Sequence, residues 1–160
     1  MFNRTSIKYL RQWAAREGRK PLVLRGARQV GKTTLVRLFA QEFDTFISLN
    51  LEEKENAELF SSDNSFEDLL AAIFFKANVP QDSTRRTLIF IDEIQCEPKA
   101  VQSLRYFYEK RPDLYVIAAG SLLESLMGRH ISFPVGRVEY MTSACPLPCT
   151  HTRWVSSRSI

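Results

Sequence analysis

Cysteine is scarce in this chain, and its scarcity argues against two kinds of small fold. The 160 residues include three cysteines. Cys96 stands alone, and Cys145 and Cys149 have no second pair at metal-binding spacing. We therefore expect free thiols rather than a disulfide framework or a zinc site.

Long apolar runs are also missing. No stretch approaches the roughly 18 consecutive apolar residues that predict a membrane-spanning helix, and residues 1–12 lack the apolar centre of a secretory signal. Apolar residues make up 44% and charged residues 25% of the chain, which is ordinary for a soluble globular protein. We expect one domain, located in the cytoplasm, with no membrane partner.

Acidic residues are almost absent from the first part of the chain. Glu17 is the only acid between Arg4 and Arg37, whereas the charged residues of the segment 42–68 are mostly acidic. Such a basic segment suits a polyphosphate ligand and would also tolerate nucleic acid. A solvated face of two helices has the same composition. The charge pattern leaves these alternatives open.

Strand and helix patterns alternate along the chain. The predicted strands cover residues 21–25, 45–51, 87–91 and 114–119, and the predicted helices cover residues 5–16, 34–43, 66–77 and 98–108. The run 87–91 is typical of a strand buried on both faces of a parallel sheet. The alternation predicts an α/β fold, a doubly wound and mainly parallel sheet with helices on both faces, with ligands at the C-terminal ends of its strands.

The P-loop pattern G-x-x-x-x-G-K-[ST] occurs between the first predicted strand and the helix that follows it. Its residues are Gly26, Ala27, Arg28, Gln29, Val30, Gly31, Lys32 and Thr33, and Thr34 comes next. Backbone N–H groups of such a loop face the β-phosphate, and the following helix adds its positive dipole end. Lys32 is expected to reach the β- and γ-phosphates, and Thr33 to offer its hydroxyl to Mg²⁺. We predict that residues 26–34 bind ATP.

Two acids, Asp92 and Glu93, end the apolar strand 87–91. A carboxylate at the position of Asp92 can hold Mg²⁺ through its water shell. Glu93 is then placed to orient and deprotonate a water, the role of a general base. An Asp-Glu pair is otherwise typical of a helix N-cap, and the P-loop makes catalysis the favoured interpretation.

Ser121, Arg129 and Arg137 follow the strand 114–119. If that strand lies between the P-loop strand and the Asp92 strand, the Ser121 hydroxyl approaches the γ-phosphate and can sense it. Ser121 can equally cap a helix at 122–127. Arg129 is a candidate arginine finger within the chain or across an oligomer, with a surface charge as the equal alternative. For Arg137 we favour the surface charge.

Four segments together resemble one family. They are Arg-Gln-Val-Gly-Lys-Thr-Thr-Leu at 28–35, Phe-Ile-Asp-Glu-Ile-Gln at 90–95, Ala-Gly-Ser-Leu-Leu at 119–123 and Pro-Val-Gly-Arg-Val-Glu-Tyr at 134–140. The chain is similar, from about its first helix to Tyr140, to the predicted AAA+ superfamily ATPases of bacteria and archaea that carry an additional C-terminal domain. The resemblance implies an extra strand between the P-loop and Asp92 strands, and ATP hydrolysis with Glu93 as the acid.

The sequence departs from that family after Met141. Residues 141–160 contain no acid and no apolar periodicity, whereas the family continues with an apolar and acidic stretch and then a second domain. We expect residues 1–140 to form the ATPase domain and residues 141–160 to be an irregular tail outside the native fold. The hypothesis that explains this tail is a frameshift or early stop in a longer protein, which would leave the ATPase weak or inactive.

The motifs favour an Mg²⁺-dependent ATPase whose hydrolysis drives a conformational change in a longer parent protein. A P-loop kinase is less favoured, because the sequence has no separate arginine-rich lid segment. The alternative from another class is a non-hydrolysing ATP-dependent switch or a DNA-associated binding module, which the basic N-terminal part permits.

Overall fold

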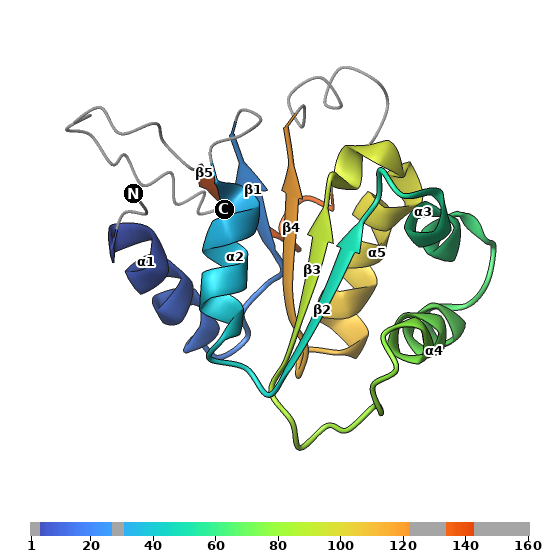
Figure 1. The fold of residues 1–160 in the computed structure, drawn as a ribbon, viewed down its shortest axis with the longest axis horizontal. Helices are drawn as coiled ribbons and strands as arrows, with labels where there is room; N and C mark the ends of the chain where they lie inside the picture. Colours follow the sequence, from blue (N-terminus) through green and yellow to red (C-terminus); the bar gives the residue numbers. More distant parts are fainter. Residues whose placement is uncertain (1–3, 27–30, 122–133, 143–160) are drawn as a thin grey trace.

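The computed structural model describes residues 4–26, 31–121 and 134–142 of the chain (Figure 1). Its elements, in chain order, are α1 (Arg4–Ala14), β1 (Leu22–Arg25), α2 (Lys32–Ala40), β2 (Thr45–Asn50), α3 (Lys54–Ser61), α4 (Phe66–Lys76), β3 (Thr87–Asp92), the short 3₁₀ helix η1 (Ile94–Cys96), α5 (Pro98–Lys110), β4 (Tyr115–Gly120) and β5 (Glu139–Thr142). Helices and strands alternate through most of this order, as the sequence predicts.

The strands form one sheet in the order β2-β3-β4-β1-β5. Every neighbouring pair is parallel, so all the strands end at the same edge. Strand β4 lies between β1, which leads into the P-loop, and β3, which ends in Asp92. The predicted α/β class and the extra strand between the P-loop and Asp92 strands are both confirmed.

Helices cover both faces of the sheet, with α1 and α2 on one side and α3, α4 and α5 on the other (Figure 1). Successive side chains of a strand point to opposite faces. Phe90 and Ile117 therefore pack in the core formed with α1 and α2, while Ile89 and Ala118 pack in the core on the opposite face. These four side chains are fully buried, which explains why their strands read as continuous apolar runs.

Besides the short 3₁₀ helix η1, helix α3 and strand β5 were not predicted from the sequence. Helix α3 buries only Asn56 and Phe60, so it has no apolar stripe at helical spacing. Strand β5 is a four-residue edge strand with alternate residues exposed. It includes Met141 and Thr142, so the prediction that the irregular tail begins at residue 141 is wrong for these two residues. Residues 143–160 lie outside the described part.

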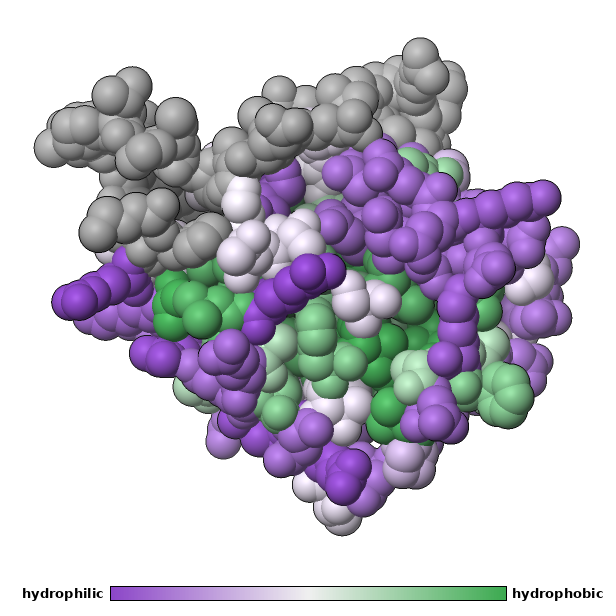
Figure 2. All heavy atoms as spheres, in the orientation of Figure 1, coloured by the Kyte–Doolittle hydropathy of each residue, from purple (hydrophilic) through white to green (hydrophobic). Residues whose placement is uncertain are grey.

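The surface mixes polar and apolar residues. Figure 2 shows apolar residues gathered in the middle of one face, with polar residues around them. Phe75 on α4 leaves 87% of its surface exposed. None of the helices within the described ranges is long and apolar enough to cross a membrane.

Candidate functional site

The structure describes both ends of the P-loop. Gly26 directly follows β1, and Gly31 directly precedes α2. Their φ angles are 149° and 78°, a region of backbone conformation that residues with a Cβ adopt only with strain. The glycines of the motif therefore occupy positions that require glycine. Ala27, Arg28, Gln29 and Val30 lie outside the described residues.

Helix α2 presents its N-terminus at the C-terminal edge of the sheet. The first turn of the helix contains no acid, and no side chain caps it. Its first N–H groups, including those of Thr33 and Thr34, have no carbonyl partner within the helix. These groups and the helix dipole together make the N-terminus suitable for an anion such as phosphate.

Lys32 is buried at this helix start, with 8% of its surface exposed. Its Nζ donates a hydrogen bond of 2.8 Å to the carbonyl oxygen of Gly26. Burial lowers the pKa of Lys32, although the carboxylates of Glu93 and Asp92 act to raise it. Burial therefore deprives the ammonium of part of its hydration, and a phosphate group beside it would stabilise the charged form.

Thr33 and Asp92, the two predicted magnesium ligands, are in direct contact. The Thr33 hydroxyl donates a hydrogen bond of 2.7 Å to Oδ2 of Asp92. A hydroxyl and a carboxylate are oxygen ligands of the kind that Mg²⁺ prefers. The described residues contain no group of three or more His, Cys, Asp or Glu that could hold a metal. A magnesium ion at this pair would therefore depend on phosphate oxygens and water for its other ligands.

Glu93 adopts a left-handed conformation, with φ 51° and ψ 45°. This conformation is uncommon for a residue other than glycine and concentrates at functional sites. Its Oε2 accepts a hydrogen bond from Ser121 Oγ at 3.3 Å and a short one from Gln95 Nε2. The Glu93 side chain makes no capping hydrogen bond to η1, so the N-cap interpretation of the acidic pair is not supported for Glu93.

Ser121 reaches Glu93 because β4 and β3 are neighbours and both residues directly follow these strands. The structure thus brings together Lys32, Thr33, Asp92, Glu93 and Ser121 from three separate segments. Whether Ser121 also caps a helix at 122–127 falls outside the described residues, as does Arg129.

Gln95, the last residue of the segment 90–95, has no role that the sequence predicts. It lies two residues after Glu93, in a short 3₁₀ helix without periodic pattern, so only its proximity to Glu93 could have suggested it. Its Oε1 is buried and has no hydrogen-bond partner in the described part of the protein.

Arg137 forms an ion pair with Glu109 on α5 and is partly exposed, as expected for a surface charge.

The parallel sheet and the P-loop framework define a P-loop domain of the α/β class. Sequence comparison supplies the family. A family model described as an AAA domain matches residues 18–148, which is most of the chain, so the protein belongs to the AAA domain family. Members of this class are P-loop domains that bind nucleotide.

Two further comparisons are more limited. No curated protein matches this chain. Among solved structures, PCH-2 of C. elegans is similar with a TM-score of 0.49 and 18% sequence identity. The similarity covers 87% of this chain and 39% of the PCH-2 chain, so this chain spans well under half of that length.

Proposed function

We propose that this chain binds ATP with Mg²⁺ and hydrolyses it to ADP and phosphate. The observation that carries the proposal is the 2.7 Å hydrogen bond between Thr33 Oγ1 and Asp92 Oδ2. This contact joins the start of helix α2, which follows the P-loop, to Asp92 at the end of strand β3. It therefore supports a single site for the proposed phosphate-binding and metal-binding groups.

The binding roles follow from the chemistry of each group. Residues 26–34 supply backbone N–H groups for the phosphates, and the Lys32 ammonium neutralises part of their charge. Thr33 and Asp92 offer oxygen atoms to Mg²⁺. When bound, Mg²⁺ offsets the negative charge that develops on the phosphate oxygens during transfer.

Glu93 is the proposed general base. A carboxylate that follows the metal-binding Asp92 can orient a water and accept its proton. The contacts from Ser121 and Gln95 both go to Oε2 of Glu93 and fix the orientation of that carboxylate. Ser121 is the proposed phosphate sensor, and Arg129 the proposed arginine finger, supplied within the chain or by a neighbour in an oligomer.

The biological setting is part of the same proposal. We propose a cytoplasmic ATPase unit of a longer parent protein, in which hydrolysis drives a conformational change. Residues 1–140 with the end of β5 would form this unit. A nucleic-acid partner is compatible with the basic N-terminal segment, but no contact described above requires one.

The test is Mg²⁺-dependent ATP turnover by the purified chain and by Lys32→Ala and Glu93→Gln. Lys32→Ala should lose ATP binding, because the buried ammonium is removed. Glu93→Gln should keep binding and lose about a hundredfold or more in turnover, the size of a general-base effect. Lys54→Ala and Glu58→Gln are charge-matched controls, since this ion pair on α3 is largely exposed, with side-chain exposures of 89% and 61%.

The outcomes separate the alternatives. Binding without turnover in the unmodified chain would favour the non-hydrolysing switch, and no binding would overturn the proposal. Turnover per chain that rises with protein concentration would indicate an arginine supplied between subunits.

A further inference from the structure

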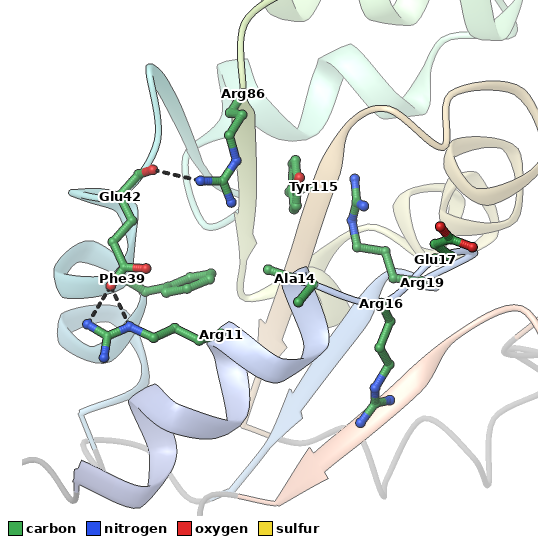
Figure 3. A pocket seen from close by; sticks show the side chains of 10 residues that line it. Arg11, Ala14, Arg16, Glu17, Arg19, Phe39, Glu42, Arg86 and Tyr115 are labelled. Carbon is green, nitrogen blue, oxygen red and sulfur yellow. Dashed lines mark hydrogen bonds and ion pairs between the residues drawn. The ribbon is translucent and has the colours of Figure 1, made fainter.

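A second polar cavity lies at the opposite edge of the sheet from the candidate ATP site. Its volume is about 440 Å³, and residues of α1, α2 and the segments that precede the strands line it (Figure 3). Arg86 directly precedes β3, and Tyr115 is the first residue of β4. Ser121 follows the same strand six residues later, so the two sites are about 20 Å apart at the usual rise of a strand.

The charges around this cavity are unbalanced. Four guanidiniums and two carboxylates line it, those of Arg11, Arg16, Arg19, Arg86, Glu17 and Glu42. Arg11 forms an ion pair of 2.6 Å with Glu42. Arg16 points toward β5 (Figure 3), where it forms an ion pair of 2.9 Å with Glu139. In the described residues, Arg19 and Arg86 have no ion pair with a carboxylate.

Arg19 and Arg86 share one aromatic ring. The Cζ atoms of Arg19 and Arg86 lie 3.5 Å and 5.2 Å from the centre of the Tyr115 ring, and the ring stands between the two side chains (Figure 3). Burial lowers the pKa of Arg19, and the positive charge of Arg86 lowers it further, while Tyr115 and the carboxylate of Asp113 oppose the change. Two like charges are thus held close together, a cost that a bound anion would relieve.

The hydrogen bonds of this pair go to neutral acceptors. Arg19 Nη2 donates to the carbonyl oxygens of Pro112 and Asp113 at 3.1 and 3.4 Å. Arg86 Nη1 donates to the carbonyl oxygen of Glu42 at 3.2 Å. The carboxylate of Asp113 itself pairs with Arg111. These contacts hold both guanidiniums in place beside the cavity without a direct ion pair, although the Asp113 carboxylate compensates part of the Arg19 charge from a distance.

We propose that this cavity binds a small multivalent oxyanion, a phosphate- or carboxylate-bearing metabolite, through Arg19 and Arg86. Guanidinium forks match the oxygen geometry of both groups. Tyr115, which is partly exposed, provides apolar surface for the rest of the ligand. A small ligand is favoured over a polynucleotide, because Glu17 and Glu42 also line the cavity and would repel a long polyanion. This site is independent of the proposed ATPase activity.

The experiment is a calorimetric titration of the full chain with pyrophosphate and, separately, with citrate. Lys32→Ala is used as the background, so that the P-loop ammonium does not contribute to anion binding. Ionic strength is held constant, because multivalent anions screen exposed charges. We expect one anion per chain, and the two titrations distinguish a phosphate ligand from a carboxylate ligand.

Variants of the two arginines identify the cavity. Arg86→Gln should raise the dissociation constant about tenfold or more, which corresponds to the loss of one charge-assisted hydrogen bond. Arg19→Lys keeps the charge but loses the planar fork, and it should also weaken binding. Arg85→Gln is the matched control, because Arg85 is exposed, adjacent to Arg86 and does not line the cavity. It should leave the constant within about twofold.

Three results would overturn the proposal. They are no binding of either anion, equal weakening by Arg85→Gln and Arg86→Gln, and tighter Arg86-dependent binding of duplex DNA than of the small anions. Arg86-dependent anion binding, combined with no ATP binding by the unmodified chain, would support this site while the ATPase proposal fails.

Discussion

At the scale of single residues, the position of the Glu93 carboxylate depends on two donors from different elements. Gln95 belongs to η1, in the same loop as Glu93, and Ser121 follows β4. Both donate to Oε2, and the backbone of Glu93 is left-handed. If Glu93 is the general base, as proposed, a carboxylate held in this way needs little reorganisation before it accepts a proton.

Replacing Gln95 tests its role as a positioning residue. Gln95→Met keeps a similar volume and removes the amide donor, so the Glu93 carboxylate gains freedom to rotate. We expect kcat for ATP hydrolysis to fall about tenfold, with the dissociation constant of ATP unchanged, because only the catalytic step depends on this orientation. Steady-state kinetics together with ATP titration measure the two quantities.

Gln102→Met is the control for this substitution, since Gln102 is exposed on α5. A Gln95→Met chain that loses ATP binding as well would indicate a structural role for Gln95. Unchanged kcat would show that Ser121 alone positions the carboxylate.

The sequence predicts some site residues better than others for a physical reason. Lys32, Thr33 and Asp92 belong to motifs whose spacing the phosphate and metal chemistry dictates, and the structure brings them together. Gln95 acts through a local side-chain contact that no fixed spacing demands. The stack of arginines on Tyr115 joins residues that are far apart in the chain, so only the folded sheet reveals it.

At the scale of elements, the sequence predicts the helices and strands that bury at least one apolar face in the core. The predicted strands and helices correspond to β1 to β4 and to α1, α2, α4 and α5. Strand β5 is different, because it forms by parallel pairing with β1, more than a hundred positions earlier in the sequence. Its stability depends on contacts with distant residues rather than on its own composition.

One of these contacts can be tested alone. Arg16 Nη1 donates to both carboxylate oxygens of Glu139 at 2.9 and 3.1 Å, which ties β5 to the end of α1. Glu139→Gln should weaken this contact and speed hydrogen exchange of the β5 amides about two- to fivefold, the range expected for a partly exposed ion pair. Amides of β3 should not change.

Glu58→Gln serves as the comparison in this experiment, because it removes the same charge from the exposed pair with Lys54. Equal acceleration in both variants would attribute the effect to net charge. No acceleration in Glu139→Gln would mean that the β ladder alone holds β5.

At the scale of the whole molecule, the uneven charge of the sequence is partly balanced by folding. Basic residues of the first segment pair with acids that come later in the chain, Arg11 with Glu42 and Arg16 with Glu139. The basic charges that remain near the sheet divide between its two edges, with Lys32 at one and Arg19 at the other. This division fits two separate anion sites better than one continuous basic surface for nucleic acid.

The C-terminal boundary of the folded domain is also decided at the scale of the whole molecule. Strand β5 ends at Thr142, whereas the family model extends to residue 148. The composition of residues 143–160, with no acid and no apolar periodicity, predicts that they add little to the core. A chain that ends at Thr142 should therefore have the same urea midpoint as the full chain, followed by circular dichroism.

A chain that ends at Val138 provides the contrast. Val138 belongs to the core, with 7% of its surface exposed, so this chain keeps the core and loses only β5. Removing β5 exposes the edge of β1 and leaves Arg16 without Glu139, and the free energy of unfolding should fall by at least about 1 kcal/mol. If the chain that ends at Thr142 is instead as unstable as this one, residues beyond 142 belong to the domain, as the family match to residue 148 suggests.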